Sequence, residues 1–396
     1  MLNAIALSGD YNYINQIETT IKSILYNNSN VKIYVINTDI PQEWFLGVNK
    51  FLKNTNNEIR DIKIDPSILQ SFKTSHIHIS NIAWARILIP KLISNDRILY
   101  LDSDIIVDDN IDELFLFDMD NYPIAAVQEI FQKSTGYFNS GVMVINNHQL
   151  RRNPNFVDEL FKKGKLNNKN GDQTVLNSYF NRYYHLDSKY NFQIGFDSLY
   201  PSSIIKNENI QKLYEAQIRR VHNRKIIHYM CNSKPWYPTS YVRMRDKWWH
   251  YRMMDFSAAV YHTPKSHHIP TLFTMTNSQD FESLEKLVKL LPNYNFQIAA
   301  WTNMGWNLIR LQQYPNVKLY PGIIPPVLDD LINNANGYLD INFGPKDNEL
   351  IKNFANTKRP IFAFNNTTSK RYNINYYVFS PNELNQMVNK IKLLIN

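Results

Sequence analysis

The sequence predicts an α/β fold in two domains, and three features of the chain indicate it. Its 396 residues are more than one hydrophobic core usually organises. Over the first ~100 residues, apolar runs of strand length alternate with stretches of helical spacing, which is typical of a largely parallel sheet covered on both faces. A second, shorter series of alternating strand and helix patterns begins after His262. The expected domains are therefore residues 1–262 and 263–396.

The elements expected in the first domain follow in strand-helix order. Strands are predicted at Ala4–Ser8, Val31–Asn37, Ile59–Ile64 and Arg97–Leu101, and helices at Gln16–Leu25 and Ile82–Leu92. In such a sheet, ligands bind beyond the carboxyl ends of the strands. The polar residues that directly follow two of these strands, Ser8–Asn12 and Asp102–Asp104, are therefore the first candidates for a site.

The expected second domain repeats this pattern over ~130 residues. Its strands are predicted at Pro270–Met275, Phe296–Trp301, Val317–Tyr320, Gly337–Ile341 and Pro360–Phe364. Its helices are predicted at Phe281–Leu291, Val327–Ala335 and Pro381–Leu394. The polar segment Thr263–His268, which contains a proline, is the expected linker between the domains.

Composition and charge exclude several classes of protein. Lys and Arg number 43 against 35 Asp and Glu, a net charge of +8, but no run of five basic residues marks a nucleic-acid partner. A diffuse basic charge suits a phosphorylated small molecule or an anionic membrane surface. The single cysteine, Cys231, can form no intrachain disulfide. Because Met1–Asp10 lacks a signal-peptide pattern, the expected location is the cytoplasm, with peripheral membrane contact left open.

Asp102 and Asp104 carry the strongest chemical signal in the chain. They follow the apolar run Arg97–Leu101, one residue separates them, and a second apolar run, Ile105–Val107, comes next. Two carboxylates at this spacing can bind one Mn²⁺ or Mg²⁺ ion through oxygen. The alternative is that Asp102 caps a helix. Because Ile105–Val107 continues as a strand, the spacing favours a metal site.

A second group of polar residues ends the segment Ile227–Trp236. His228 follows a strand-like run and can complete the coordination of a cation, whereas Lys234 can bind a phosphate oxygen as a point charge. Taken alone, a histidine such as His228 is more often a packed core residue than a ligand, and a tryptophan such as Trp236 is more often ordinary core.

Four segments, in this order along the chain, resemble glycosyltransferase family eight, which contains the bacterial lipopolysaccharide galactosyltransferases and the glycogenins. They are Ala6–Tyr13, Leu101–Asp104, the pair Tyr137–Val144 and Gly171–Thr174, and His228–Trp236. In the last segment Cys231 stands where the family has glycine. The resemblance covers residues 1–262 and implies a GT-A fold, a UDP-sugar donor, an Mn²⁺ or Mg²⁺ ion, and retention of the anomeric configuration.

The resemblance also implies a role for each matching residue. The metal ligands would be Asp102, Asp104 and His228. The donor would contact Ser8, Asp10, Asn12, Arg86, Ser103 and Lys234, of which Lys234 would bind the diphosphate. The transferred sugar would be surrounded by Asn139, Asp172 and Gln173. Because an amide such as Gln173 is a poor nucleophile, we favour attack from the leaving-group face, with the departing phosphate taking the acceptor's proton.

Several of these residues have structural alternatives. Asn139–Gly141 could form an ordinary turn, Asp172 could cap the helix predicted at Gln173–Phe180, and Arg86 could pair with an acid on the surface. The segment Arg243–Met254 mixes basic and aromatic residues. It would lie on an anionic membrane, or its tryptophans would pack between the domains while its basic residues stay solvated.

Residues 270–396 resemble, more loosely, the carboxyl-terminal half of the GT-B glycosyltransferases that decorate serine-rich bacterial adhesins. Gly337–Gly344 and Lys358–Thr367 carry this resemblance, and no glycine-rich dinucleotide fingerprint accompanies them. The expected role of this domain is to bind a glycan or glycoprotein acceptor, or to form a homo-oligomer.

The expected function is transfer of a hexose or N-acetylhexosamine from a UDP-sugar to a glycan acceptor, one carried by a serine-rich adhesin being the candidate. The alternatives are a metal-dependent nucleotidyltransferase and a catalytically inactive module that binds a nucleotide or a glycan.

Overall fold

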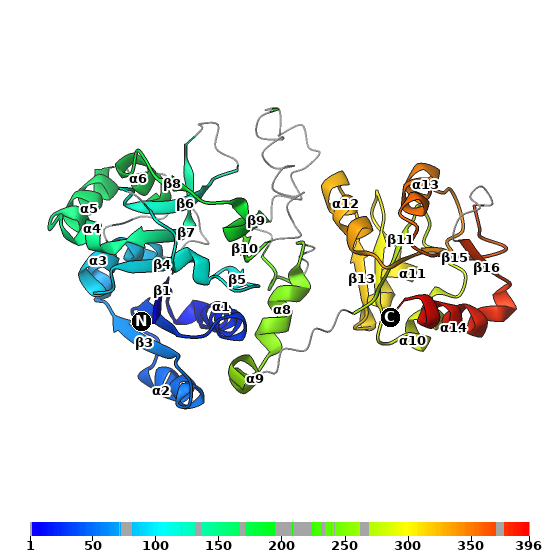
Figure 1. The fold of residues 1–396 in the computed structure, drawn as a ribbon, viewed down its shortest axis with the longest axis horizontal. Helices are drawn as coiled ribbons and strands as arrows, with labels where there is room; N and C mark the ends of the chain where they lie inside the picture. Colours follow the sequence, from blue (N-terminus) through cyan, green and yellow to red (C-terminus); the bar gives the residue numbers. More distant parts are fainter. Residues whose placement is uncertain are drawn as a thin grey trace. The chain divides into compact units, whose positions relative to one another are not determined.

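The computed structural model describes residues 2–70, 72, 81–119, 121–130, 136–166, 171–194, 208, 224–230, 234–238, 240, 242–261, 269–369 and 376–395. These residues form two compact units, Met1–Thr263 and Pro264–Asn396, each with its own sheet (Figure 1). Cys231 and the expected linker Thr263–His268 lie outside the described residues.

A seven-stranded mixed sheet forms the centre of the first unit, in the order β3-β2-β1-β4-β7-β6-β8. Its strands are β1 (Asn3–Ser8), β2 (Val31–Asn37), β3 (Glu58–Lys63), β4 (Arg97–Leu101), β6 (Ile124–Gln128), β7 (Phe138–Asn146) and β8 (Tyr184–His185). The first four of these strands are parallel, and β7 runs antiparallel to both β4 and β6. A smaller sheet has the order β5-β10-β9, from Ile105–Val107, Ile226–Tyr229 and Phe192–Ile194.

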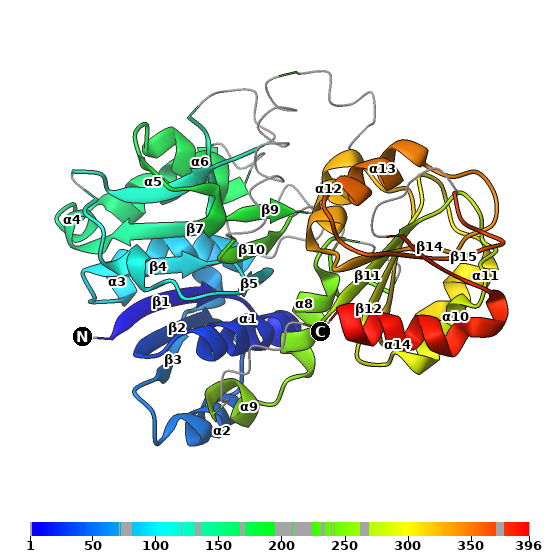
Figure 2. The ribbon, with the colours of Figure 1, turned by 45° about the vertical axis from the view of Figure 1, so that its right-hand side comes forward.

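Helices cover both faces of the large sheet (Figures 1 and 2). One face packs against α1 (Ile14–Asn27), α2 (Gln42–Leu52), η4 (Asp112–Phe115) and α9 (Phe256–Tyr261). The other packs against η2 (Pro66–Leu69), η3 (Asn81–Leu88), α3 (Ile89–Leu92), α4 (Asn147–Arg151), α5 (Phe156–Leu166) and α6 (Gly171–Tyr179). Two short turns, η1 (Tyr11–Tyr13) and η6 (Ser188–Tyr190), precede α1 and β9. The spacing of Ile17, Ile21 and Ile24 predicted α1, and all three are fully buried.

The helix predicted at Ile82–Leu92 differs from expectation. Asn81–Leu88 forms a 3₁₀ helix, and only Ile89–Leu92 is α-helical. Pro90 gives a physical reason, because it has no N–H to donate to the carbonyl of Arg86 and its ring disfavours α geometry at the preceding residue.

The basic and aromatic segment Arg243–Met254 forms α8 (Arg245–Met253) and packs within the first unit. Trp248 is 2% exposed and joins a core cluster with Phe192 and Tyr229. The expectation that the basic residues stay solvated is wrong for Arg243, which is buried. The Lys247 side chain is 37% exposed, and its ammonium lies 2.9 Å from an Asp108 oxygen. Among the described residues, no helix is long and apolar enough to cross a membrane.

A six-stranded parallel sheet forms the centre of the second unit, in the order β13-β12-β11-β14-β15-β16. Its strands are β11 (Thr271–Met275), β12 (Asn295–Ala299), β13 (Val317–Tyr320), β14 (Gly337–Asp340), β15 (Ile361–Phe364) and β16 (Tyr376–Phe379). The helices between them are α10 (Leu284–Leu290), α11 (Trp306–Ile309), η9 (Arg310–Gln313), α12 (Pro325–Asn334), α13 (Asn348–Asn356), η10 (Pro381–Glu383) and α14 (Leu384–Leu394). The strand order reverses between β11 and β14, so the ligand-binding point typical of such sheets lies there.

Asp340, the last residue of β14, is a fully buried charge in the second unit. Its carboxylate accepts hydrogen bonds from the Lys346 ammonium at 2.6 Å, from the Ser369 backbone N–H and hydroxyl at 2.9 Å each, and from the Tyr376 hydroxyl. A buried carboxylate of this kind ties the segments after β14 and β15 together.

Replacing Asp340 with alanine is expected to lower the free energy of unfolding by about 3–5 kcal/mol, because the Lys346 ammonium is left largely buried without its partner. Urea unfolding of the full chain measures this. Asp329→Ala, at an exposed position on α12 of the same unit, should change stability by less than about 0.5 kcal/mol. Equal unfolding midpoints for the two variants would show that the buried pair contributes nothing.

Candidate functional site

The pairing of strands assembles a polar site at the carboxyl ends of β1 and β4. These strands pair with Leu7 opposite Leu101, so Ser8 and Asp102 follow at the same edge of the sheet. The chain then enters β5, whose antiparallel pairing with β10 places Ile105 opposite His228. This pairing brings a histidine from far along the sequence to the aspartate motif.

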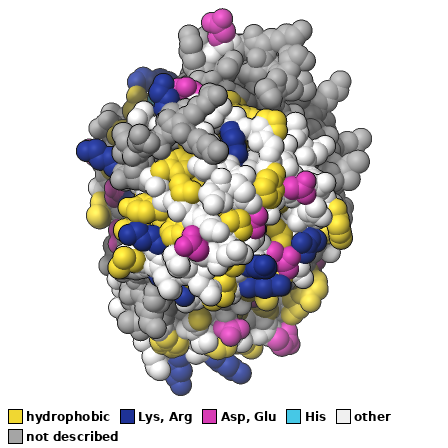
Figure 3. Space-filling view, turned by 90° about the vertical axis from the view of Figure 1, so that its right-hand side faces the viewer, with side chains coloured by type: hydrophobic (Ala, Val, Ile, Leu, Met, Phe, Trp, Pro, Cys, Tyr) yellow, Lys and Arg dark blue, Asp and Glu magenta, His cyan; other side chains and the backbone are white. Residues whose placement is uncertain are grey.

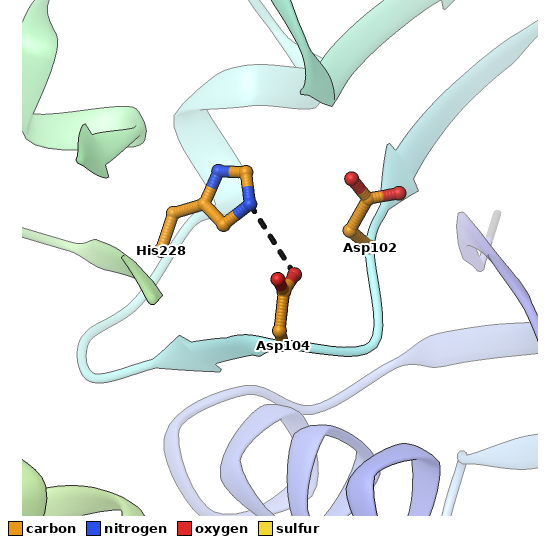
Figure 4. Close-up of side chains that lie close together, drawn as sticks. All are labelled: Asp102, Asp104 and His228. Carbon is orange, nitrogen blue, oxygen red and sulfur yellow. Dashed lines mark ion pairs between the residues drawn. The ribbon is translucent and has the colours of Figure 1, made fainter. Parts of the chain in front are cut away.

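Asp102, Asp104 and His228 lie around one small space (Figure 4). One possible ligand atom from each of the three lies within 4.8 Å of the others, and His228 Nε2 is 3.2 Å from Asp104 Oδ1. The alternative that Asp102 caps a helix is wrong, because the chain between β4 and β5 forms only a turn. Asp104 lies in the same turn and caps no helix either. Two carboxylates and an imidazole are a donor set suited to a divalent cation.

Asn191 orients the imidazole of His228. The side-chain oxygen of Asn191, Oδ1, is 3.0 Å from His228 Nδ1 and can only accept a hydrogen bond. The ring proton therefore lies on Nδ1, and the lone pair is on Nε2. That lone pair lies beside Asp104 Oδ1, a buried oxygen with no hydrogen-bond partner among the described residues. Two electron-rich atoms at this separation fit a cation shared between them.

Lys234 lies against the same aspartate. Its ammonium donates hydrogen bonds to Asp104 Oδ2 and to the Tyr229 carbonyl, at 2.6 Å each. Burial by itself raises the pKa of Asp104, but the Lys234 ammonium outweighs it and holds that pKa well below its usual range. Asp104 is therefore ionised at neutral pH, as a metal ligand must be.

Arg86 is buried between two carboxylates. It donates to Asp102 Oδ1 at 2.8 Å, and its Nε lies 2.9 Å from Asp172 Oδ2. A third contact runs from its guanidinium to the Ser140 carbonyl at 2.8 Å. Burial lowers the pKa of Arg86, but the charges of Asp102 and Asp172 outweigh this effect and raise the pKa above its usual value. Arg86 is 6% exposed, so the alternative that it pairs with an acid on the surface is wrong.

Asp172 lies beside Arg86 in the first turn of α6 (Gly171–Tyr179), inside the helix rather than at its cap position. Burial raises its pKa, and the charge of Arg86 partly offsets that effect. Its Oδ2 receives no hydrogen bond from Arg86, because the Nε–H donates to the Ala83 carbonyl instead. Asp172 thus presents a buried oxygen with capacity for a further partner.

Gln173 and Asn139 are held by a residue that the sequence analysis missed, Glu129. Glu129 Oε2 accepts from Asn139 Nδ2 at 2.8 Å and from Gln173 Nε2 at 3.1 Å. Gln173 Oε1 in turn accepts from the Ser140 backbone N–H at 2.9 Å. Glu129 directly follows strand β6, so the rule that found Asp102 could have found it. Asn191 gave no such signal.

Gly141 makes the close approach of these groups possible. It lies in β7, so the turn alternative for Asn139–Gly141 is wrong. A Cβ at this position would collide with the His228 ring and lie 2.8 Å from Asp102 Oδ2. Any larger residue would therefore displace two of the three candidate metal ligands.

The residues expected to contact uridine follow β1. Ser8 Oγ and the Tyr100 hydroxyl are 2.8 Å apart, and Ser103 Oγ donates to the Ser8 carbonyl at 3.0 Å. Asp10 accepts from the Asn12 backbone N–H at 3.1 Å and so caps η1. Ser8 and Ser103 are buried and bonded within the protein, whereas Asp10 is partly exposed and Asn12 is exposed.

Two family models match this chain. Residues 4–239 match the model of glycosyl transferase family 8, and residues 272–396 match that of the GftB/GlyA-F C-terminal domain. The first match contains every candidate residue described above.

Curated relatives come from Streptococcus pneumoniae serotype 4. Glycosyltransferase GlyD is 36% identical over 99% of this chain, which spans 48% of GlyD, about half its length. Glycosyltransferase GlyE is 34% identical over 96% of this chain and 95% of its own.

Solved structures show the same fold. The apo form of GlyE matches with a TM-score of 0.55, at 32% identity over the whole of both chains. The galactosyltransferase LgtC, in complex with donor and acceptor sugar analogues, matches 63% of this chain and 95% of its own with a TM-score of 0.53 at 22% identity. The predicted fold class, a GT-A unit followed by a smaller α/β unit, is confirmed.

Proposed function

Because the chain belongs to glycosyltransferase family 8, we propose that it transfers a hexose or N-acetylhexosamine from a UDP-sugar to a glycan acceptor, with retention of anomeric configuration. The observation that carries this proposal is the cluster of Asp102, Asp104 and His228, with Lys234 beside it, at the carboxyl ends of β1 and β4. Ionised acids and a cationic side chain at this edge suit a nucleoside diphosphate bound through a divalent ion.

Asp102, Asp104 and His228 are the residues that would hold Mn²⁺ or Mg²⁺. When bound, the ion supplies positive charge that stabilises a diphosphate leaving group. Lys234 would exchange its contact with Asp104 for one with a diphosphate oxygen. Ser8, Asp10, Asn12 and Ser103 would contact the uridine, and Arg86 would hold Asp102 and Asp172 in place.

Asn139, Asp172 and Gln173 would position the donor sugar. The Gln173 amide is already bonded to Ser140 and Glu129, which suits a positioning role better than a nucleophilic one. We therefore favour attack from the face of the leaving group. The acceptor oxygen bonds to the anomeric carbon as the bond to the diphosphate breaks, and the acceptor's proton passes to the diphosphate. A covalent sugar trapped on Asp172 would contradict this route.

Products distinguish this reaction from that of a nucleotidyltransferase. The protein would be incubated with UDP-glucose, UDP-galactose or UDP-N-acetylglucosamine and a panel of oligosaccharide acceptors. We expect UDP and an α-linked product, the linkage being read from the anomeric coupling constant by NMR. Release of pyrophosphate would favour the nucleotidyltransferase instead. A β-linked product would contradict retention.

The second unit matches the GftB/GlyA-F C-terminal domain, and part of this chain resembles GtfB of Streptococcus agalactiae, the stabilizing protein of a peptide N-acetylglucosaminyltransferase, which favours a glycoprotein acceptor. We propose that the acceptor glycan is carried by a serine-rich adhesin and that this unit binds the acceptor or forms a homo-oligomer. The proposed location is the cytoplasm, with peripheral membrane contact as an alternative.

Replacing Asn191 with alanine is expected to weaken Mn²⁺ binding by about 10- to 100-fold, because the His228 imidazole loses the acceptor that sets its tautomer. Calorimetric titration of Mn²⁺ in the presence of UDP measures this. Asn147→Ala is the matched control, since Asn147 is equally buried but bonds only the carbonyls of Ile93 and Asn95. Equal Mn²⁺ affinity in the two variants would remove Asn191 from the metal site.

A further inference from the structure

Three loops of the second unit meet at the carboxyl edge of its sheet, where the strand order reverses. They follow β11, β12 and β14 and comprise residues 276–283, 300–306 and 341–347. The Phe343 backbone N–H donates to the Asp280 carbonyl at 2.8 Å, and the Trp301 indole lies 3.3 Å from Asp347 Oδ2. Asn307, next to Trp306, donates to Asp280 Oδ1 at 3.3 Å. The loops are therefore one connected surface, which we term the loop surface.

Aromatic side chains are unusually exposed on the loop surface. Trp306 is 71% exposed, Trp301 39% and Phe343 38%. A single exposed aromatic residue needs no explanation, but three on connected loops leave apolar area in water that a ligand could cover.

Buried polar atoms without partners lie at the same point of the sheet. Asn342, which follows β14, is 1% exposed, and its Nδ2 has no hydrogen-bond partner among the described residues. Thr274, on the neighbouring strand β11, is also 1% exposed, and its Oγ1 likewise has no hydrogen-bond partner among the described residues. A buried polar group without a partner calls for an explanation, and a role at a binding site is one such explanation.

The charges on the loop surface favour a neutral ligand over a phosphorylated one. In the sequence of the three loops, Lys346 is the only Lys or Arg, and its ammonium is engaged by Asp340 at 2.6 Å and Asn342 Oδ1 at 2.9 Å. The remaining polar groups are amides, hydroxyls and the carboxylates of Asp280, Glu282 and Asp347. On the face drawn in Figure 3, Lys and Arg side chains are dispersed among acidic ones and form no continuous patch.

We propose that the loop surface is a carbohydrate-binding site for a neutral oligosaccharide. Sugar rings present apolar C–H faces that stack on aromatic rings, and their hydroxyl groups donate to carboxylates and amides of the kind found here. The site would be separate from the transferase site of the first unit and would need no metal. It would give the protein a second contact with a glycan besides the one at which a sugar is transferred.

Binding of lactose, maltotriose and N,N′-diacetylchitobiose to the full chain tests the proposal, with saturation-transfer NMR and calorimetry as readouts. We expect at least one of them to bind, and Trp306→Ala to weaken that binding at least ten-fold. Leu393→Ala is the matched control, because Leu393 is 70% exposed on α14 of the same unit, and it should bind as wild type does. Trp306 is so exposed that its removal should leave the fold intact.

Two further variants separate this site from the transferase reaction. Asp104→Asn should retain oligosaccharide binding while losing donor cleavage, and Trp306→Ala should retain UDP release in the absence of acceptor. Oligosaccharide binding that is equal in wild type and Trp306→Ala would place the sugar elsewhere and overturn the proposal. No binding of any of the three sugars at millimolar concentration would overturn it as well, without bearing on the transferase activity.

Discussion

Asp104→Asn is expected to lower metal-dependent UDP release by about 10³-fold or more. Asparagine keeps the volume of the side chain but removes the charge that would bind the cation and that faces Lys234 and His228. The rate of UDP formation from the preferred UDP-sugar, measured at saturating Mn²⁺, gives the size of the effect.

Asp96→Asn is the control for this variant. Asp96 precedes β4, and its side chain is 74% exposed and pairs with Arg151 on the surface. We expect its UDP release to match wild type. If Asp104→Asn also retained near wild-type activity, the aspartate motif would not be the metal site.

Arg86→Met should have the second largest effect, because it alters stability and activity together. The Asp102 and Asp172 carboxylates would lose the cation buried between them, at a cost of about 3–5 kcal/mol in the free energy of unfolding. UDP release should fall at least ~10²-fold, since both carboxylates would be displaced or protonated. Urea unfolding and the UDP assay measure the two effects.

The conservative variant Arg86→Lys should restore neither the stability nor the activity that Arg86→Met loses. A single ammonium cannot reproduce the planar set of N–H groups that reaches Asp102 and Ser140 while facing Asp172. Arg60→Met, on β3 with a side chain 57% exposed, is the stability control and should stay within about 0.5 kcal/mol of wild type. A fully active and stable Arg86→Lys variant would show that charge alone matters.

Much of the fold could be predicted because the strands are short, buried apolar runs. Val31–Asn37 and Arg97–Leu101 are strands with the predicted bounds. The edge strand β16 (Tyr376–Phe379) was missed, since its side chains are half-buried or exposed and its pattern is correspondingly weak. Helix α13 (Asn348–Asn356) was also missed, although Leu350, Ile351 and Phe354 are spaced for one buried face and Asp347 caps it.

The candidate site was only partly readable for a different reason. Asp102 and Asp104 follow a strand directly, so their place at the sheet edge is a local property of the chain. The contact of His228 with Asp104 depends on the pairing of β5 with β10, which spacing alone does not give. Asn191 acts through His228, a partner far along the chain, and only the folded structure brings the two together.

The most direct test of the central claim is the rate of UDP release by the full chain from a panel of UDP-sugars, with Mn²⁺ or with a chelator. Slow donor hydrolysis needs no acceptor, so the acceptor's identity is not required. We expect release of UDP from at least one sugar with Mn²⁺ and its loss with the chelator. UDP release unchanged by the chelator would contradict the metal site. No release from any sugar, with no donor binding by calorimetry, would contradict the transferase activity.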